Sequence, residues 1–135
     1  MTPEIFKKRT KLFALAVLKF SGTLPRSYTV DVLGRQLVRC STSVGANNRA
    51  ACRAKSAADF IAKMKIVEEE ADEAVYWLEL LNDGGFANAD QVQPLLHEAN
   101  EIVAMTVASI KTKRMHLTGE SPNQSSTVNQ KSSIV

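Results

Sequence analysis

The segment Arg35–Leu81, RQLVRCSTSVGANNRAACRAKSAADFIAKMKIVEEEADEAVYWLELL, contains the clearest helical pattern of this 135-residue chain. In its first half, helical geometry places four arginines within an arc of roughly 80°: Arg35, Arg39, Arg49 and Arg53. The opposite side of the same helix carries Leu33, Leu37, Cys40, Val44 and Ala51. One helix therefore faces a core and presents a row of guanidinium groups on its back. This pattern favours a polyanion or an acidic partner over a catalyst.

The second half of the segment predicts a helix that starts at Ser56 and has two apolar stripes. A heptad seam with 4-3 spacing, typical of helices that pack at shallow crossing angles, consists of Phe60, Met64, Val67, Ala71, Ala74, Leu78 and Leu81. A second stripe points elsewhere and comprises Ile66, Tyr76, Trp77 and Leu80. A helix in a small monomer needs one buried stripe, so the second predicts a subunit interface, with a thicker core as the alternative.

Apolar periodicity predicts further helices from about Pro3 to Phe20, from near Ser27 to about Arg53, and from about Asp90 to Arg114. We expect Gly22 to cap the first helix, and Asp90 with Gln93 to cap the last, whose first turn would hold Pro94. Four amphipathic helices with short links predict an all-α, antiparallel up-down four-helix bundle over residues 1–116.

Two parts of the chain depart from the regular helical pattern: the position of Gly45 and residues 117–135. Gly45 interrupts good helix formers, at a cost of about 1 kcal/mol relative to Ala. It either allows close packing against a neighbouring backbone, which we favour, or marks a bend. Residues 117–135 are dominated by Ser, Thr, Asn, Gln and Pro, which predicts a disordered polar tail.

Charge is distributed unevenly along the chain. Residues 1–53 hold ten Lys/Arg against two acids, whereas residues 54–113 hold five against eleven. A basic surface therefore faces away from an acidic one, or the two face each other.

Cys40 and Cys52 would lie about 18 Å apart on one helix, too far for an intramolecular disulfide. The short apolar run Leu12–Leu18 cannot span a bilayer, so we expect a soluble, cytoplasmic protein that needs no membrane.

No catalytic or metal-binding pattern is present in the sequence. Neither His97 nor His116 has a Glu three residues before it, as di-metal bundles require. The acids from Glu68 to Glu73 avoid the heptad seam, which favours a solvated or salt-bridging face over a metal site. Nucleophile–base signatures and a phosphate-binding glycine loop are missing. We therefore expect no enzyme, no cofactor and no metal.

The arginine row has two interpretations, and the residues alone support both equally. Arginine forks match phosphate oxygens, and an oligomer would align several rows. Lys7, Lys8, Arg9 and Lys11 add a second basic patch. No aromatic residues are interleaved with the arginines, so backbone contact is favoured over base stacking. Alternatively, the arginines pair with the acidic run of the next helix or with an acidic protein partner, where each exposed ion pair contributes roughly 0–1 kcal/mol.

The sequence also resembles a known family, the bacterial four-helix bundle proteins that include the 23S rRNA intervening-sequence proteins. The resemblance covers roughly residues 5–113. Its residues are Arg35-Gln36-Leu37 through Ser43-Val44-Gly45-Ala46-Asn47, Arg49-Ala50-Ala51, Ser56, Asp59-Phe60-Ile61, Lys63, and Glu70-Ala71-Asp72-Glu73 to Tyr76-Trp77-Leu78. Where relatives commonly carry Ser-Ile-Pro-Ala-Asn-Ile-Ala-Glu-Gly, this chain departs at Gly45 and from Asn48 to Ala51.

The resemblance implies an up-down bundle assembled as a homopentameric ring, without enzymatic activity. Some relatives are encoded inside insertions in ribosomal RNA genes. Related accessory proteins of diversity-generating retroelements form basic pentamers that bind nucleic acid and engage a reverse transcriptase. We therefore expect a non-enzymatic, oligomeric protein that binds nucleic acid through Arg35, Arg39, Arg49 and Arg53. RNA is the nucleic acid that we favour. The alternative is an interaction scaffold, for example an accessory subunit of a reverse transcriptase.

Overall fold

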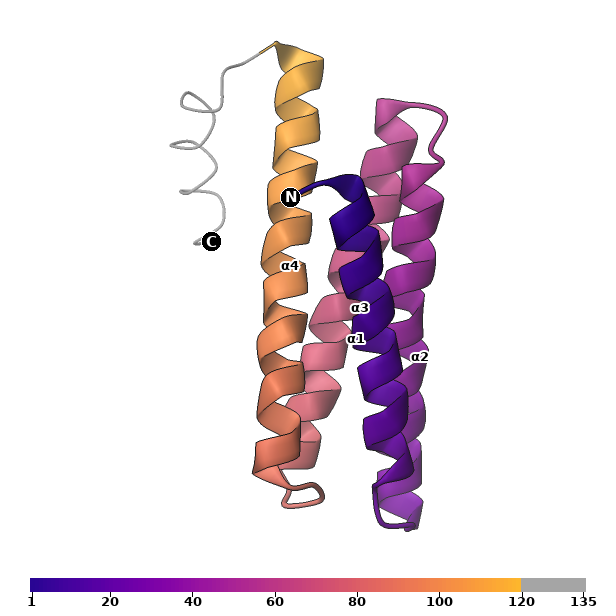
Figure 1. The fold of residues 1–135 in the computed structure, drawn as a ribbon, viewed down its shortest axis with the longest axis vertical. Coiled ribbons are helices and arrows are strands. Elements are labelled where there is room, and N and C mark those ends of the chain that lie inside the picture. Colours follow the sequence, from indigo (N-terminus) through magenta and orange to yellow (C-terminus); the bar gives the residue numbers. More distant parts are fainter. Residues whose placement is uncertain (120–135) are drawn as a thin grey trace.

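The chain folds into four α-helices in a computed structural model that describes residues 1–119. The helices are α1 (Pro3–Gly22), α2 (Tyr28–Cys52), α3 (Ala57–Asp83) and α4 (Ala89–Thr118). Residues 1–119 contain no β-strand. Consecutive helices run in opposite directions (Figure 1), as expected for an up-down arrangement. None of these helices combines the length and the apolar character that a membrane crossing requires.

Hydroxyl side chains define the starts of the first three helices. The Oγ1 atom of Thr2 accepts from the Ile5 N–H at 3.2 Å, and the Oγ of Ser27 accepts from the Val30 N–H at 3.1 Å. Ser56 accepts in the same way from the Asp59 N–H at 3.1 Å. Each bond satisfies an N–H that has no partner within its helix. The predicted starts near Pro3, Ser27 and Ser56 are therefore confirmed.

Two expected helix caps are wrong, one by one residue and the other by two. Gly22 is the last residue of α1 instead of its cap, because Thr23 closes the helix by donating its N–H to Phe20 O. The α4 cap is Asn88, whose Oδ1 accepts from the Asp90 N–H at 2.8 Å. Because α4 therefore begins at Ala89, Pro94 lies in its second turn and removes one intrahelical hydrogen bond there.

At its other end, α4 continues to Thr118, and Gly119 closes it in the left-handed conformation (φ 73°). Leu117 and Thr118, which we assigned to the polar tail, therefore belong to α4. The rest of that predicted tail, residues 120–135, lies outside the described residues.

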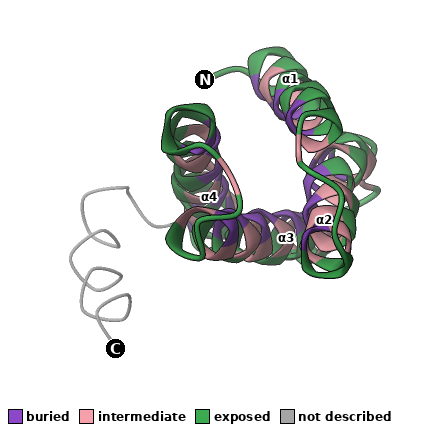
Figure 2. Cartoon of the chain, turned by 90° about the horizontal axis from the view of Figure 1, so that it is seen from below, coloured by how far each residue is buried: buried purple, intermediate pink, exposed green. Residues whose placement is uncertain are grey.

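The core lies where the two halves of the central segment predict it. On α3, the whole heptad seam is buried except Phe60, which is half-buried. On α2, Leu37, Cys40 and Val44 are fully buried on the side opposite the arginines. Seen from one end of the bundle, the buried residues of all four helices face the interior (Figure 2). Apolar burial of this kind is the main stabilising contribution to such a bundle.

The four helices are not equally well packed against their neighbours. α2 packs extensively on α3, and α3 on α4, whereas α1 and α4 contact each other least (Figure 2). A bidentate ion pair bridges them: Arg9 donates from Nε and Nη2 to Glu98 at 2.9 and 2.6 Å. These hydrogen bonds raise the pKa of Arg9. The ion pair therefore joins the first helix to the last where apolar contact is thin.

Gly45 packs closely against a neighbouring backbone, as we favoured, and α2 continues through it as regular helix. A Cβ built on Gly45 would lie 3.6 Å from the carbonyl oxygen of Thr10 on α1. That separation is an ordinary van der Waals contact. The position therefore has room for one methyl group.

We expect Gly45→Ala to raise the free energy of unfolding by about 0.5–1 kcal/mol, because Ala is the better helix former. Gly45→Leu should lower it by about 1–3 kcal/mol, because its branches would press against the α1 backbone. Urea unfolding followed by the fluorescence of Trp77, the only tryptophan, measures both. A destabilised Gly45→Ala variant would contradict this account of the packing.

Candidate nucleic-acid interface

The four predicted arginines lie on the outer side of α2, but they do not form one site. All four are exposed, but the guanidinium of Arg39 is engaged by α3. On the helical wheel, Arg39 and Arg49 lie at opposite edges of the arginine arc. Arg39 accordingly leans towards α3, and Arg49 leans towards α1. The row is thus divided between two neighbouring helices.

Arg39 is the centre of an ion-pair network with α3. It pairs with Glu70 at 3.1 Å and with Glu73, and its Nε donates to Gln36 at 3.0 Å. Desolvation lowers the pKa of Arg39, but the two carboxylates raise it by more, so the pKa lies above its ordinary value. Glu73 also accepts from the Trp77 indole N–H at 2.9 Å. The acidic run of α3 is therefore the partner of Arg39, as the second interpretation of the row predicted for all four arginines.

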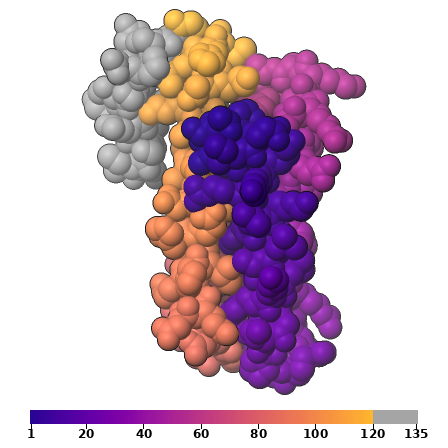
Figure 3. All heavy atoms as spheres, viewed as in Figure 1, coloured from indigo at the N-terminus to yellow at the C-terminus, as the bar shows by residue number. Residues whose placement is uncertain are grey.

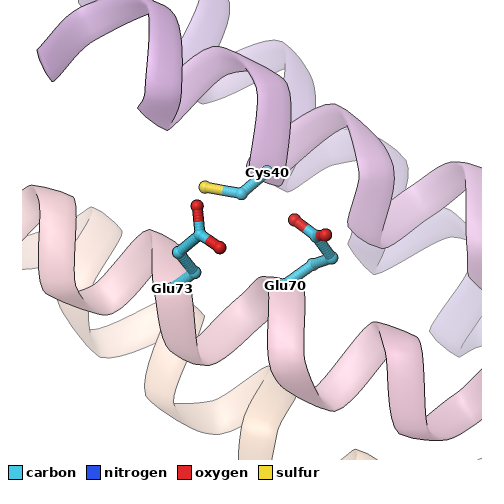
Figure 4. Close-up of side chains that lie close together, drawn as sticks. All are labelled: Cys40, Glu70 and Glu73. Atoms are coloured by element: carbon cyan, nitrogen blue, oxygen red, sulfur yellow. The ribbon is translucent and has the colours of Figure 1, made fainter.

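A thiol lies directly under this network. Cys40, Glu70 and Glu73 place their sulfur and carboxylate oxygens within 4.8 Å of one another (Figure 4). Burial raises the pKa of Cys40 to about 12, with Glu73 adding to the rise, and its Sγ donates to Leu37 O at 3.4 Å. The carboxylates already bind a guanidinium, and the sulfur is protonated at neutral pH. The cluster therefore fits an ion-pair network better than a metal site, which needs a thiolate and free carboxylates.

The two cysteines should differ strongly in reactivity, because the thiolate is the nucleophile. Cys52 is exposed and Cys40 is buried, and neither is in a disulfide. We expect iodoacetamide at pH 8 to modify Cys52 in the native protein and to spare Cys40, and mass spectrometry of the peptides to show it. Unfolding in urea should make both react, and equal native reactivity would contradict the burial of Cys40.

The same pKa predicts a pH dependence of stability. The pKa of Cys40 is raised from 9.0 to about 12 in the folded state, so folding favours the protonated thiol. Its contribution to stability is complete below pH 9 and is lost as the pH rises towards 12. Cys40→Ala should weaken that alkaline loss in a urea titration.

Basic side chains line a groove between α1 and α2, which we call the basic groove. Its volume is about 830 Å³, and its cations are Lys7, Lys8, Lys11, Arg49 and Arg53. Small residues of α2, among them Gly45, Ala46 and Ala50, line it. The only acid in the lining is Glu4, which pairs with Lys7 at 3.3 Å. Five cations against one acid make this surface attractive to phosphate groups.

The antiparallel packing of α1 on α2 creates this groove. It brings the first turns of α1 beside the last turns of α2, so two basic clusters distant in sequence become one surface (Figure 1). The sequence predicts the α1 cluster as a separate patch that includes Arg9. Arg9 instead points to Glu98 of α4 and lies outside the basic groove. The predicted up-down topology and the helical spacing of Lys7, Lys8 and Lys11 were the features from which the joining of the two clusters could have been predicted.

Arg35 lies apart from the basic groove. It lines a hollow formed by α2 and the α1–α2 link, next to Arg39 of the same row. Arg26 and Asp31 also line this hollow and form an ion pair at 3.2 Å. Arg35 and Arg53 are eighteen residues apart on one helix, or about 27 Å. Of the four predicted arginines, the structure thus brings Arg49 and Arg53 together with lysines. Arg35 and Arg39 line a different hollow, where Arg39 pairs with acids of α3.

The predicted subunit interface on α3 is half exposed in the single chain. Ile66 and Tyr76 are 40% and 52% exposed, whereas Trp77 and Leu80 are half-buried. The rings of Tyr76 and Trp77 meet edge to face, with centroids 5.2 Å apart. Trp77 is held by Glu73 and packs against the core, so part of this stripe is indeed a thicker core. Ile66 and Tyr76 are the members that remain available to a second subunit.

Fold and surface together define a class: an all-helical bundle with a basic groove on one helix pair and acidic residues concentrated on the other. The family model of the 23S rRNA-intervening sequence proteins matches residues 4–108, and the chain belongs to that family. A crystal structure of a Bacteroides thetaiotaomicron protein of unknown function, from the S23 ribosomal protein family, is 33% identical with a TM-score of 0.76. The match covers 82% of this chain and 99% of that one. No curated protein matches the sequence significantly.

Proposed function

We propose that this chain is a non-enzymatic nucleic-acid-binding protein that holds the phosphate backbone of a structured RNA in the basic groove. The observation that carries the proposal is the convergence of Lys7, Lys8, Lys11, Arg49 and Arg53 on one groove with a single acid. Arginine and lysine side chains there can contact successive phosphates, and small residues between them let a backbone approach closely. No aromatic residue lines the groove, so sequence preference should be weak.

We further propose that the protein acts as a homo-oligomer, a pentameric ring, with the exposed part of the α3 stripe at the subunit contact. A ring would present several basic grooves to one RNA, and linked sites bind far more tightly than one. The family in which the chain belongs, and the exposure of Ile66 and Tyr76, support this assembly.

The test is fluorescence anisotropy of a labelled structured RNA over rising salt concentration. Binding through about five cations per groove predicts that the logarithm of the association constant falls with the logarithm of salt, with a slope of about −4 to −5 per engaged groove. A shallow slope, or no binding near 0.15 M salt, would contradict the proposal.

A second candidate function is a protein-interaction scaffold, such as an accessory subunit of a reverse transcriptase. One observation favours it: Arg39 already binds Glu70 and Glu73, which shows that arginines of the row can be satisfied by carboxylates. An acidic partner surface would engage Arg49 and Arg53 in the same way. This candidate predicts negligible RNA affinity and a partner that is lost when those arginines are replaced.

A further inference from the structure

A cavity of about 510 Å³ lies at the end of the bundle where α1 begins and α4 ends. All four helices contribute to it, and its apolar walls include Phe6, Phe60, Met64 and Met105. In Figure 3, the first residues of α1 lie across the front of this end, between α4 and the junction of α2 with α3. Its volume is within the range of cavities that bind small molecules, and the basic groove does not include these walls.

One polar side chain of this cavity is buried without a partner. Asn48 on α2 is 3% exposed, and its Nδ2 has no hydrogen-bond partner among the described residues. Leaving a buried donor unsatisfied costs about 1–3 kcal/mol. A neutral side chain in this position suits a neutral acceptor, such as a hydroxyl or carbonyl oxygen, better than a buried charge.

The charged groups of the cavity are all potential cations. Lys113 and His116 on α4 line it, and its lining contains no Asp or Glu. The Nζ of Lys113 lies 4.9 Å from the centroid of the Phe60 ring, and Lys113 is only half-buried. Exposed His116 lies one turn further along α4. An anionic head group would therefore be attracted to this rim and remain in contact with water.

We propose that this cavity binds a small amphipathic carboxylate. Its apolar chain lies between Phe6 and Met64, its carboxylate lies at Lys113, and a neutral oxygen on the chain accepts a hydrogen bond from Asn48. Hydroxylated or oxo-substituted medium-chain carboxylic acids have this chemistry. The site is separate from the basic groove, so its ligand and the RNA can bind independently.

The test uses the full chain and displacement of a fluorescent anilinonaphthalene sulfonate by decanoate and by a panel of hydroxydecanoates. We expect one ligand per chain, and at least one hydroxydecanoate should bind about tenfold more tightly than decanoate, through the hydrogen bond to Asn48. That preference should disappear in Asn48→Leu, which removes the unpaired amide at similar size, while decanoate still binds. Asn100→Leu, at an exposed asparagine of α4, is the control.

Two further variants and one control locate the ligand. Lys113→Met should weaken decanoate several-fold and leave decanol unchanged, whereas Lys111→Met on the same helix but outside the lining should change neither. Ala108→Trp should fill the cavity and abolish displacement; Ala108 is exposed, so the fold should tolerate it. Three results would overturn the proposal. The first is no binding of decanoate, and the second is a preference for hydroxydecanoate that persists in Asn48→Leu. The third is no such preference in the wild type, which is the result expected if a water molecule already accepts the hydrogen bond of Asn48.

Discussion

Reversing three charges of the basic groove, as Lys8→Glu, Arg49→Glu and Arg53→Glu together, should weaken RNA binding at least about 100-fold at 0.15 M salt. Each phosphate contact contributes about one unit to the salt slope, so the slope should become shallower by about three. All three residues are exposed, and no ion pair involves them in the described part of the chain. Their replacement should therefore leave the fold intact, as circular dichroism would show.

The matched control reverses three charges outside the groove: Lys65→Glu, Lys111→Glu and Arg114→Glu. Lys65 and Arg114 are exposed and Lys111 is half-buried, and none lines the basic groove. The change in net charge is identical, so a general loss of attraction to RNA would affect both variants equally. An equal loss would refute a local phosphate site. Wild-type protein without RNA affinity would instead direct the search to an acidic protein partner.

The second large effect concerns assembly: Ile66→Asp with Tyr76→Asp should dissociate the oligomer. Aspartates at these exposed positions would have to be buried in a subunit contact without a partner, which is strongly unfavourable. Light scattering coupled to gel filtration should then give a mass near the 14.8 kDa of one chain, against about five times that value for the wild type. Affinity for RNA should fall with it, because linked grooves are lost.

The control for assembly is Leu18→Asp with Val107→Asp. These residues on α1 and α4 are 45% and 43% exposed, so the substitutions alter the apolar surface to a similar extent. An intact oligomer in this control and a monomer in the α3 variant would place the contact on α3. The reverse result would place the contact on α1 and α4, and a monomeric wild type would refute the assembly itself.

Arg39 illustrates why a helical wheel could not define the site. Its angle on α2 differs from that of Arg49 by only about 80°, and both lie within the predicted arc. That difference is enough to direct one side chain to the carboxylates of α3 and the other to the lysines of α1. A single sequence gives the angle of each residue about its own helix, but not which helix stands beside it.

The ends of the helices could also be predicted only in part from the sequence. Ser27 and Ser56 were recognisable because a hydroxyl precedes an apolar run, and both caps are present. At α4, Asn88 and Asp90 are both good capping residues. In the structure the cap is Asn88, and Pro94 therefore lies in the second turn of α4. From the sequence we predict Asp90 alone, two residues beyond the observed cap.

Periodicity in the chain was sufficient for the four helices, the heptad seam on α3 and the buried side of α2, because each depends on the spacing of residues along one helix. The family follows from the same central segment. The union of Lys7, Lys8 and Lys11 with Arg49 and Arg53, the capture of Arg39 by Glu70 and Glu73, and the cavity around Asn48 depend on which helices are neighbours. Such contacts join residues far apart in the chain, so they exist only once antiparallel packing has set the helices side by side.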